Sequence, residues 1–294
     1  MELRHLRYLV AVADTGTITA AAHELHVAQP GVSSQLRQLE RELGETLLVR
    51  GPRAVELTEA GRAVLPHARA ALAAVEGARD AVAGLRGLLR GRVAVGMASS
   101  LPETVVADQV GEFAAAHPGV TVELREGTAD DLADDLRAGR LDLVVAGFPR
   151  TPPDGLDGVV LIEDRLVAAV AADDELAGRR AVPLAALAGR PLICLPRGHG
   201  LRAAFDDACA ARGLTPGVAF EAGAMNLLLR LAARGAGVAV VPAPALGAGP
   251  VQALDRPPVA VALDPEVRTR MYLLWRTGGP AGPAARALQA RLTP

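Results

Sequence analysis

The chain has 294 residues and a net charge of −2; 50% of its residues are hydrophobic and 22% are charged. This length suggests about two domains, and the balanced composition excludes a disordered or polybasic chain. No apolar stretch reaches the roughly 18 residues of a membrane helix, and charged Glu2 and Arg4 stand where a secretion signal has its apolar run. Cys194 and Cys209 are too few for a disulfide framework, so we expect a cytoplasmic protein with no membrane segment.

Residues 1–57, which we call the head, predict three short helices. Apolar residues at helical spacing indicate a first helix from about Leu3, which Gly16 ends. Thr17 is a suitable N-cap for a second helix over residues 18–25. A tight turn at residues 26–28 then leads to a third, amphipathic helix that has Pro30 in its first turn and runs to about Leu43. A short helix, a tight turn and a second amphipathic helix form a helix-turn-helix pattern.

The third helix and the segment after it carry candidate DNA contacts. The helix is expected to have an outward polar face of Gln29, Ser33, Ser34 and Arg37, residue types that bind base edges and phosphates in a major groove. Two short strands predicted at 47–49 and 55–57 bracket Arg50 and Arg53, which is typical of a wing with a basic tip. Spacing alone equally allows an ordinary solvated helix face beside an ordinary basic turn.

Residues 3–61 contain HLRYLVAVADTGTITAAAHELHVAQPGVSSQLRQLERELGETLLVR and LTEAG, and they resemble the winged helix-turn-helix of the LysR-type transcriptional regulators. The resemblance implies that residues 28–43 are the recognition helix. It also implies a set of residues at the DNA, with the last two on the wing: Gln29, Pro30, Ser33, Ser34, Arg37, Arg50 and Arg53. Ser34 stands where many relatives carry Arg, which affects phosphate contacts or base preference. Leu48 stands where Phe is usual.

Residues 58–89 predict one long helix, capped by Thr58 and containing Pro66, where we expect a bend. Its apolar residues alternate four and three apart and form a heptad seam: Val64, Ala68, Ala71, Val75, Ala78, Val82, Leu85 and Leu89. We expect the seam to pair with a second copy of the chain; the alternative is a helix packed on its own C-terminal domain. The LysR resemblance implies the linker helix of a dimer, a near-palindromic operator and a homotetramer.

Residues 91–294 alternate strand-like and helix-like segments, which predicts α/β structure with a mostly parallel sheet in two lobes. HPGVTVELREG, LRAGRLDLVVAGF and LLLRLAARGAGVAVVPA resemble the LysR effector-binding domain, which is similar to periplasmic binding proteins. The resemblance implies lobe one over 92–162 and 267–294, and lobe two over 163–266. The expected organisation is therefore a winged helix-turn-helix (1–58), a linker helix (59–90) and a two-lobed α/β effector domain (91–294).

Three predicted strand ends carry groups that suit an anion: Ser99 with Ser100, Thr128, and Arg197 with His199. Ligands in open α/β sheets bind beyond the carboxyl ends of the strands, where helix N-termini offer N–H groups. The alternative is plain helix capping. The LysR resemblance adds Phe148 and Met225 to the site and implies a small organic acid or amino acid as effector.

GHGLRAAFDDAC and FEAG resemble the peroxide-sensing branch of the family, which carries a reactive cysteine where this chain has Gly200. Without a thiol there, that disulfide switch cannot operate. An enzyme and a pure solute-binding protein are the rival interpretations. The sequence has no nucleophile elbow, P-loop, zinc motif or dinucleotide fingerprint, so we expect no catalytic residue, metal or cofactor. The expected partners are double-stranded DNA, a small-molecule effector, further copies of the chain and RNA polymerase.

Overall fold

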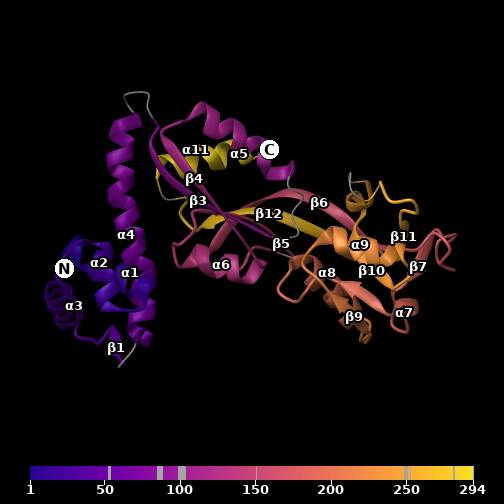
Figure 1. The fold of residues 1–294 in the computed structure, drawn as a ribbon, viewed down its shortest axis with the longest axis horizontal. Coiled ribbons are helices and arrows are strands. Elements are labelled where there is room, and N and C mark those ends of the chain that lie inside the picture. The colour runs from indigo at the N-terminus through magenta and orange to yellow at the C-terminus, as the bar shows by residue number, and fades with distance from the viewer. Residues whose placement is uncertain are drawn as a thin grey trace.

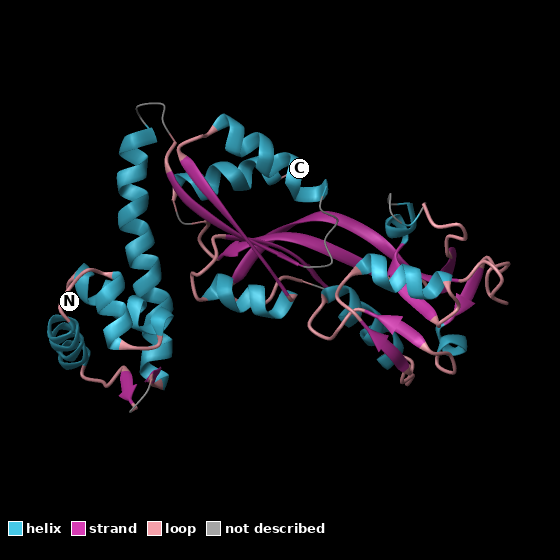
Figure 2. Ribbon diagram, viewed as in Figure 1, coloured by secondary structure: helices cyan, strands magenta, loops and turns pink. Residues whose placement is uncertain are grey.

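The computed structural model describes residues 1–51, 54–84, 89–98, 104–149, 151–247, 251, 253–280 and 282–293. The head lies at one end of the long axis of the molecule, followed by one long helix and then an elongated α/β part (Figures 1 and 2). No helix among these residues is both long enough and apolar enough to cross a lipid bilayer.

Three helices build the head: α1 (Leu3–Thr15), α2 (Ile18–Glu24) and α3 (Gln29–Leu43). Gly16 ends α1 with a left-handed φ of 73°, which glycine adopts without steric cost. The hydroxyl of Thr17 accepts a hydrogen bond of 3.1 Å from the Ala20 N–H and so caps α2. Leucine, valine and alanine side chains from the three helices form one buried core. The predicted order of helices in the head is confirmed, with α3 beginning at residue 29 instead of 28.

A two-stranded antiparallel ribbon follows α3. Strand β1 (Leu48–Arg50) pairs with β2 (Val55–Leu57), and Leu48 lies opposite Leu57. The Val55 N–H donates to the Gly16 carbonyl at 2.8 Å, which fixes the ribbon against the turn after α1.

Helix α4 (Glu59–Gly84) has a partner within its own chain. Leu65 and Ala68 are buried in the head core, and Val64 and Ala71 pack against the same core. The first half of the predicted seam therefore packs within the chain, where it covers α1, and the expectation that the whole seam pairs with a second copy is wrong for this half.

The end of the predicted seam also differs. Leu85 lies outside the described residues, and the structure does not describe the side chain of Val82. Leu89 lies beyond the last residue of α4 and packs against the core of the α/β part. Two turns of the α/β part approach α4: a Cβ added to Gly139 would lie 3.1 Å from the Arg69 Cβ, and one added to Gly77 would lie 3.4 Å from the Gly282 Cα.

The α/β part contains ten described strands: β3 (Gly91–Ala98), β4 (Val120–Gly127), β5 (Leu143–Phe148), β6 (Leu156–Val170), β7 (Ala181–Pro183), β8 (Leu192–Cys194), β9 (Val218–Glu221), β10 (Val238–Pro242), β11 (Val259–Asp264) and β12 (Arg268–Arg276). Its described helical segments are α5 (Thr104–Ala116), α6 (Ala129–Arg137), α7 (Leu184–Leu187), α8 (Gly200–Ala210), α9 (Met225–Ala233), η1 (Ala243–Gly247) and α11 (Pro283–Leu292). The strand order is β4-β3-β5-β12-β6-β10-β8-β9, with β11 between β6 and β7.

Strand β6 runs through two sheets. Its residues up to Arg165 pair with β12, and its residues from Leu166 pair with β10 and β11. The Leu166 N–H donates to the Val267 carbonyl at 2.7 Å, where the chain crosses back. We call the sheet of β4, β3, β5 and β12 with α5, α6 and α11 lobe one, and the sheet of β7 to β11 with α7, α8 and α9 lobe two.

The sheets are more mixed than predicted, since β12 runs antiparallel to both β5 and β6. The two strands that join the lobes run in opposite directions, which forces antiparallel pairing beside the parallel β3, β4 and β5. In lobe one, Val93 and Val95 face the core under α5 and α11, whereas Ala94 faces the core under α6. This alternation is the two-residue period of a strand with both faces covered.

Candidate nucleic-acid interface and effector site

The outward face of α3 is formed by four of the five residues expected there. Gln29, Pro30, Ser34 and Arg37 are exposed, but Ser33 is buried, with 8% of its surface exposed. The expectation that Ser33 points outward is wrong. It follows Val32 and lies one helical turn before Leu36, both buried, so its small side chain falls at the edge of the apolar stripe.

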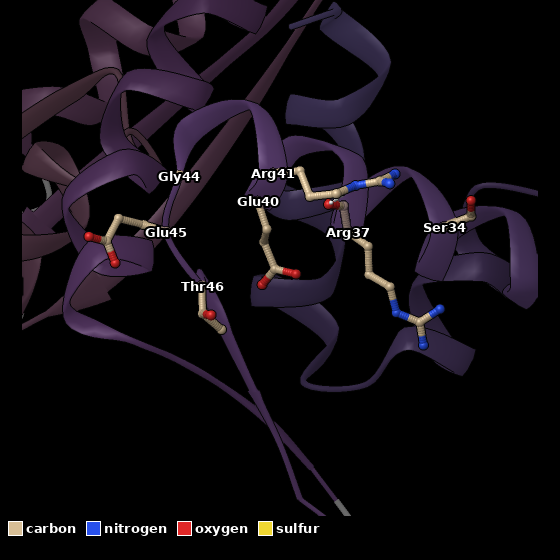
Figure 3. A pocket seen from close by; sticks show the side chains of 7 residues that line it. All are labelled: Ser34, Arg37, Glu40, Arg41, Gly44, Glu45 and Thr46. Carbon is tan, nitrogen blue, oxygen red and sulfur yellow. Dashed lines mark hydrogen bonds between the residues drawn. The ribbon is translucent and has the colours of Figure 1, made fainter.

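An open groove of about 650 Å³ runs along α3 and the turn that follows it. It is lined by Ser34, Arg37, Glu40, Arg41, Gly44, Glu45 and Thr46. Figure 3 shows the guanidinium groups of Arg37 and Arg41 toward the Ser34 end and the Glu45 carboxylate at the opposite end. The basic end of the groove therefore coincides with the exposed polar face of the helix.

Glu40 connects α3 to the wing, a role that was not predicted from the sequence. One carboxylate oxygen, Oε1, accepts hydrogen bonds from the backbone N–H groups of Leu47 at 2.9 Å and Leu48 at 3.2 Å. Leu48 is the first residue of β1, so this carboxylate holds the start of the wing against the helix. Periodicity indicated only that position 40 is not part of the apolar stripe, and nothing in the local pattern indicated its distant partners.

His5 makes a second connection to α3. Its Nδ1 accepts from the Glu2 N–H at 3.3 Å, and its Nε2 lies 2.8 Å from Oε1 of Gln35. Because Nδ1 is an acceptor, Nε2 carries the proton and donates to Gln35. The His5 side chain is buried, so α3 is held from behind by α1 as well as by the apolar core.

The predicted wing contacts are only partly described. Arg50 is the last residue of β1 and lies opposite Val55. Arg53 lies outside the described residues.

In the α/β part, Ser99 and Ser100 lie outside the described residues. Thr128 caps α6: its hydroxyl accepts from the Asp131 N–H at 3.2 Å and donates to the Asp131 carboxylate at 2.7 Å. The next N–H, that of Ala129, donates at 3.0 Å to the Gly198 carbonyl of lobe two. Two of the N–H groups expected to attract an anion are thus already paired within the chain.

The other predicted effector residues lie in different parts of the two lobes. Phe148 is only 6% exposed, and its side chain lies in the lobe-one core. Met225 begins α9 and packs against the core of lobe two, while Arg197 is exposed. The structure brings Thr128 close to the turn that carries His199.

His199 is buried beside this turn, with 4% of its surface exposed. Among the described residues, its Nδ1 has no hydrogen-bond partner. Burial lowers the pKa of the imidazole below its ordinary value, and the nearby Asp130 carboxylate opposes this effect. Burial therefore favours the neutral form of the ring.

Gly200, where the resemblance to peroxide sensors led us to expect no thiol switch, has no room for a side chain. An added Cβ would lie 1.9 Å from the Gly147 carbonyl oxygen. Cys194 and Cys209 are buried free thiols, and burial raises the pKa of both, that of Cys194 to about 12. Thiolate chemistry at neutral pH is disfavoured at these two positions.

A helix-turn-helix head with an exposed polar helix, followed by a two-lobed α/β domain, defines a DNA-binding transcriptional regulator with an effector-binding domain. The family model described as bacterial regulatory helix-turn-helix protein, lysR family, matches residues 3–62, and the model described as LysR substrate binding domain matches residues 86–293. The chain belongs to the LysR family of transcriptional regulators. It is a regulator and not an enzyme.

Relatives and solved structures agree with this assignment. The chain is 30% identical over 280 residues to the DNA-binding transcriptional dual regulator OxyR of Escherichia coli (strain K12), covering 95% of this chain and 91% of that protein. It is 36% identical over 250 residues to the HTH-type transcriptional regulator IlvR of Caulobacter vibrioides, covering 83% of each.

Among solved structures, a full-length OxyR variant from Pseudomonas aeruginosa has the same fold, with a TM-score of 0.79 at 23% identity over 99% of this chain and 93% of that one. Full-length CbnR in complex with its target DNA matches with a TM-score of 0.60 at 27% identity, over 99% of this chain and 97% of that one.

Proposed function

We propose that this regulator binds a near-palindromic operator in the cytoplasm, as a dimer or homotetramer, and that a small organic acid bound between its lobes controls transcription by RNA polymerase. The observation that carries the proposal is the polar face of α3, where Gln29 is exposed and Ser34 and Arg37 line a groove with a basic end. Glutamine and arginine side chains on a helix of this size read adenine and guanine edges in a major groove.

We assign the DNA contacts residue by residue. The floor of the DNA major groove is contacted by Gln29, Pro30, Ser34 and Arg37. The flanking phosphates are contacted from the wing by Arg50 and Arg53. Ser33 supports the helix from its buried side and does not touch bases.

We propose that residues 1–58 bind DNA, 59–90 form the dimer and 91–294 bind the effector. The half of α4 beyond the head supports the dimer, because Val75 is only partly covered and Ala78 is exposed on the heptad seam. Two heads fixed in this way would place two recognition helices on successive major grooves.

For the effector we propose the region between the lobes at Ser99, Ser100, Thr128, Arg197 and His199. The exposed Arg197 guanidinium favours an anion there. Phe148 and Met225 contribute to the cores that shape this region. A ligand acts on DNA binding only as far as it prefers one arrangement of the lobes.

Fluorescence anisotropy with the DNA upstream of the gene tests the proposal. We expect the affinity for this fragment to exceed that for random duplex DNA by at least about 10³-fold. Arg37→Ala should remove roughly 1–3 kcal/mol of operator binding, and Arg53→Ala should weaken both DNAs and lower the salt slope by about one.

The exposed lobe-two residue Arg212 supplies the control. Arg212→Ala removes the same charge far from the head and should leave both affinities and the salt slope unchanged. Equal affinity of the wild-type protein for upstream and random DNA would contradict the proposal.

A further inference from the structure

One turn of lobe two is seated on lobe one. Residues 196–200 lead into α8, and α8 contacts β5 and β12 of the other lobe (Figure 1). The contact is made by backbone atoms, because its central residues on both sides are glycines: Gly198 and Gly200 in lobe two and Gly147 in lobe one.

The first element of the contact is a hydrogen bond between lobes. The Ala129 N–H donates to the Gly198 carbonyl at 3.0 Å. Ala129 is the first residue of α6, so its N–H has no acceptor within the helix. Gly198 has a left-handed φ of 87°, and a Cβ there would lie 3.4 Å from the Thr128 Cβ. The turn thus presents its carbonyl to α6 in a conformation that favours glycine.

The second element is close packing at the start of α8. A Cβ on Gly200 would lie 1.9 Å from the Gly147 carbonyl oxygen and 2.7 Å from the Phe148 nitrogen. Real side chains do not approach backbone atoms this closely, so any residue other than glycine at position 200 must push β5 and α8 apart. His199 lies between Gly198 and Gly200 in the sequence and is buried.

We propose that residues 198–200 form an interlobe latch, in which the Gly198 carbonyl occupies the α6 N-terminus and Gly200 allows α8 to rest on β5. Both sides of the latch come from the chain itself, so the lobes are held together without a ligand atom in the contact. An effector that changes the arrangement of the lobes must therefore either break this contact or stabilise it. This regulatory consequence rests on the proposed function, whereas the latch itself does not.

Two substitutions break the latch by different means. Gly200→Ala places a methyl group against Gly147. Ala129→Pro removes the N–H that crosses between the lobes, at a helix position where proline is tolerated. The preceding Thr128 has φ −75° and ψ 159°, which a following proline accepts. Gly223→Ala is the matched control in lobe two, because a Cβ there meets nothing within 4 Å.

Amide exchange and a distance measurement test the latch in the full chain without DNA or ligand. In Gly200→Ala, we expect the Ala129 amide to exchange at least about tenfold faster than in the wild type. The Asp131 amide, which is bonded to Thr128 within α6, should be unchanged. Spin labels on Asp108→Cys in lobe one and Arg212→Cys in lobe two should move apart or broaden their distance distribution in both latch variants. Gly223→Ala should leave both readouts at wild-type values.

Wild-type exchange at Ala129 and an unchanged label distance in folded Gly200→Ala would overturn the latch. If Gly200→Ala does not fold, an unchanged label distance in Ala129→Pro overturns the latch, and a longer or broader distance supports it. Operator affinity is measured separately: a change of at least threefold in a variant with open lobes supports the regulatory consequence, and wild-type affinity in such a variant overturns it. Failure of the wild type to bind operator DNA would overturn the proposed function and leave the latch intact.

Discussion

At the scale of single residues, neighbouring serines on one helix have different surroundings. Ser34 is exposed at the basic end of the groove, whereas Ser33 is buried beside Val32 and Leu36. A helix advances about 100° per residue, so one step along α3 separates a groove-facing side chain from a core-facing one.

We therefore expect Ser34→Ala to reduce discrimination between operator and random DNA by roughly 1 kcal/mol, because the variant cannot make a hydrogen bond to a base edge. Ser33→Ala should shift the melting temperature and leave that discrimination within twofold of wild type. Anisotropy titrations with operator and random DNA measure the discrimination, and thermal melts measure the melting temperature. A larger loss of discrimination in Ser33→Ala than in Ser34→Ala would contradict the assignment of faces.

His199 should make stability depend on pH. Burial lowers its pKa in the folded chain below the ordinary value of 6.5, so the unfolded chain binds the proton more readily. The free energy of unfolding should fall as the pH drops below about 6.5 toward the lowered pKa, and above that window the contribution is constant. Thermal melts from pH 8 to pH 5 measure this, and His199→Gln should flatten the curve. The same slope in wild type and variant would show that other groups cause the pH dependence.

At the scale of elements, the orientation of the wing depends on one carboxylate of α3. Glu40 accepts two backbone N–H groups at the start of the wing, and bonds to a charged acceptor are worth about 1.5–3 kcal/mol each. Its negative charge also lies beside Arg37 and Arg41 in the groove, where it opposes DNA binding.

Two substitutions at position 40 should have opposite effects. Glu40→Gln keeps an acceptor oxygen and removes the charge, so we expect equal or tighter DNA binding with an unchanged salt slope. Glu40→Ala removes the charge and the acceptor, so binding should weaken, with a salt slope lower by about one for each phosphate that the wing no longer neutralises. Salt titrations of DNA affinity measure both. Tighter binding by Glu40→Ala than by Glu40→Gln would show that the charge outweighs the positioning of the wing.

At the scale of the whole molecule, α4 has two roles along its length. Its first half covers the head core, and Arg69 forms an ion pair with Asp14 of α1. Further along, the exposed Ala78 continues the seam that we assign to the dimer.

Ala78→Glu should place two carboxylates against each other in a paired α4 and weaken the dimer by at least tenfold, which sedimentation velocity measures. Ala70→Glu is the control, because Ala70 is exposed on α4 but lies off the heptad seam. If both variants weaken the dimer equally, or if neither weakens it, the seam is not part of the dimer interface.

Elements with local causes could be predicted from the residues alone. Apolar periodicity placed α1, α2 and α3, Gly16 and Thr17 marked their ends, and alternation of strands and helices predicted the α/β part. The same alternation did not indicate that one strand, β6, passes through both lobes, because Glu163, Asp164 and Arg165 interrupt its apolar run.

Which candidate groups are available depends on contacts between distant parts of the chain. Spacing cannot show that Glu40 reaches the wing, that half of the α4 seam is used by the head, or that Ser33 is buried. Thr128 and Gly198 are 70 residues apart in the sequence, and the contact between them exists only because β6 and β12 carry one lobe back onto the other. A capping pattern in the sequence predicts that a helix begins there with free N–H groups. It does not predict which carbonyl pairs with them, because that carbonyl can belong to a distant part of the chain.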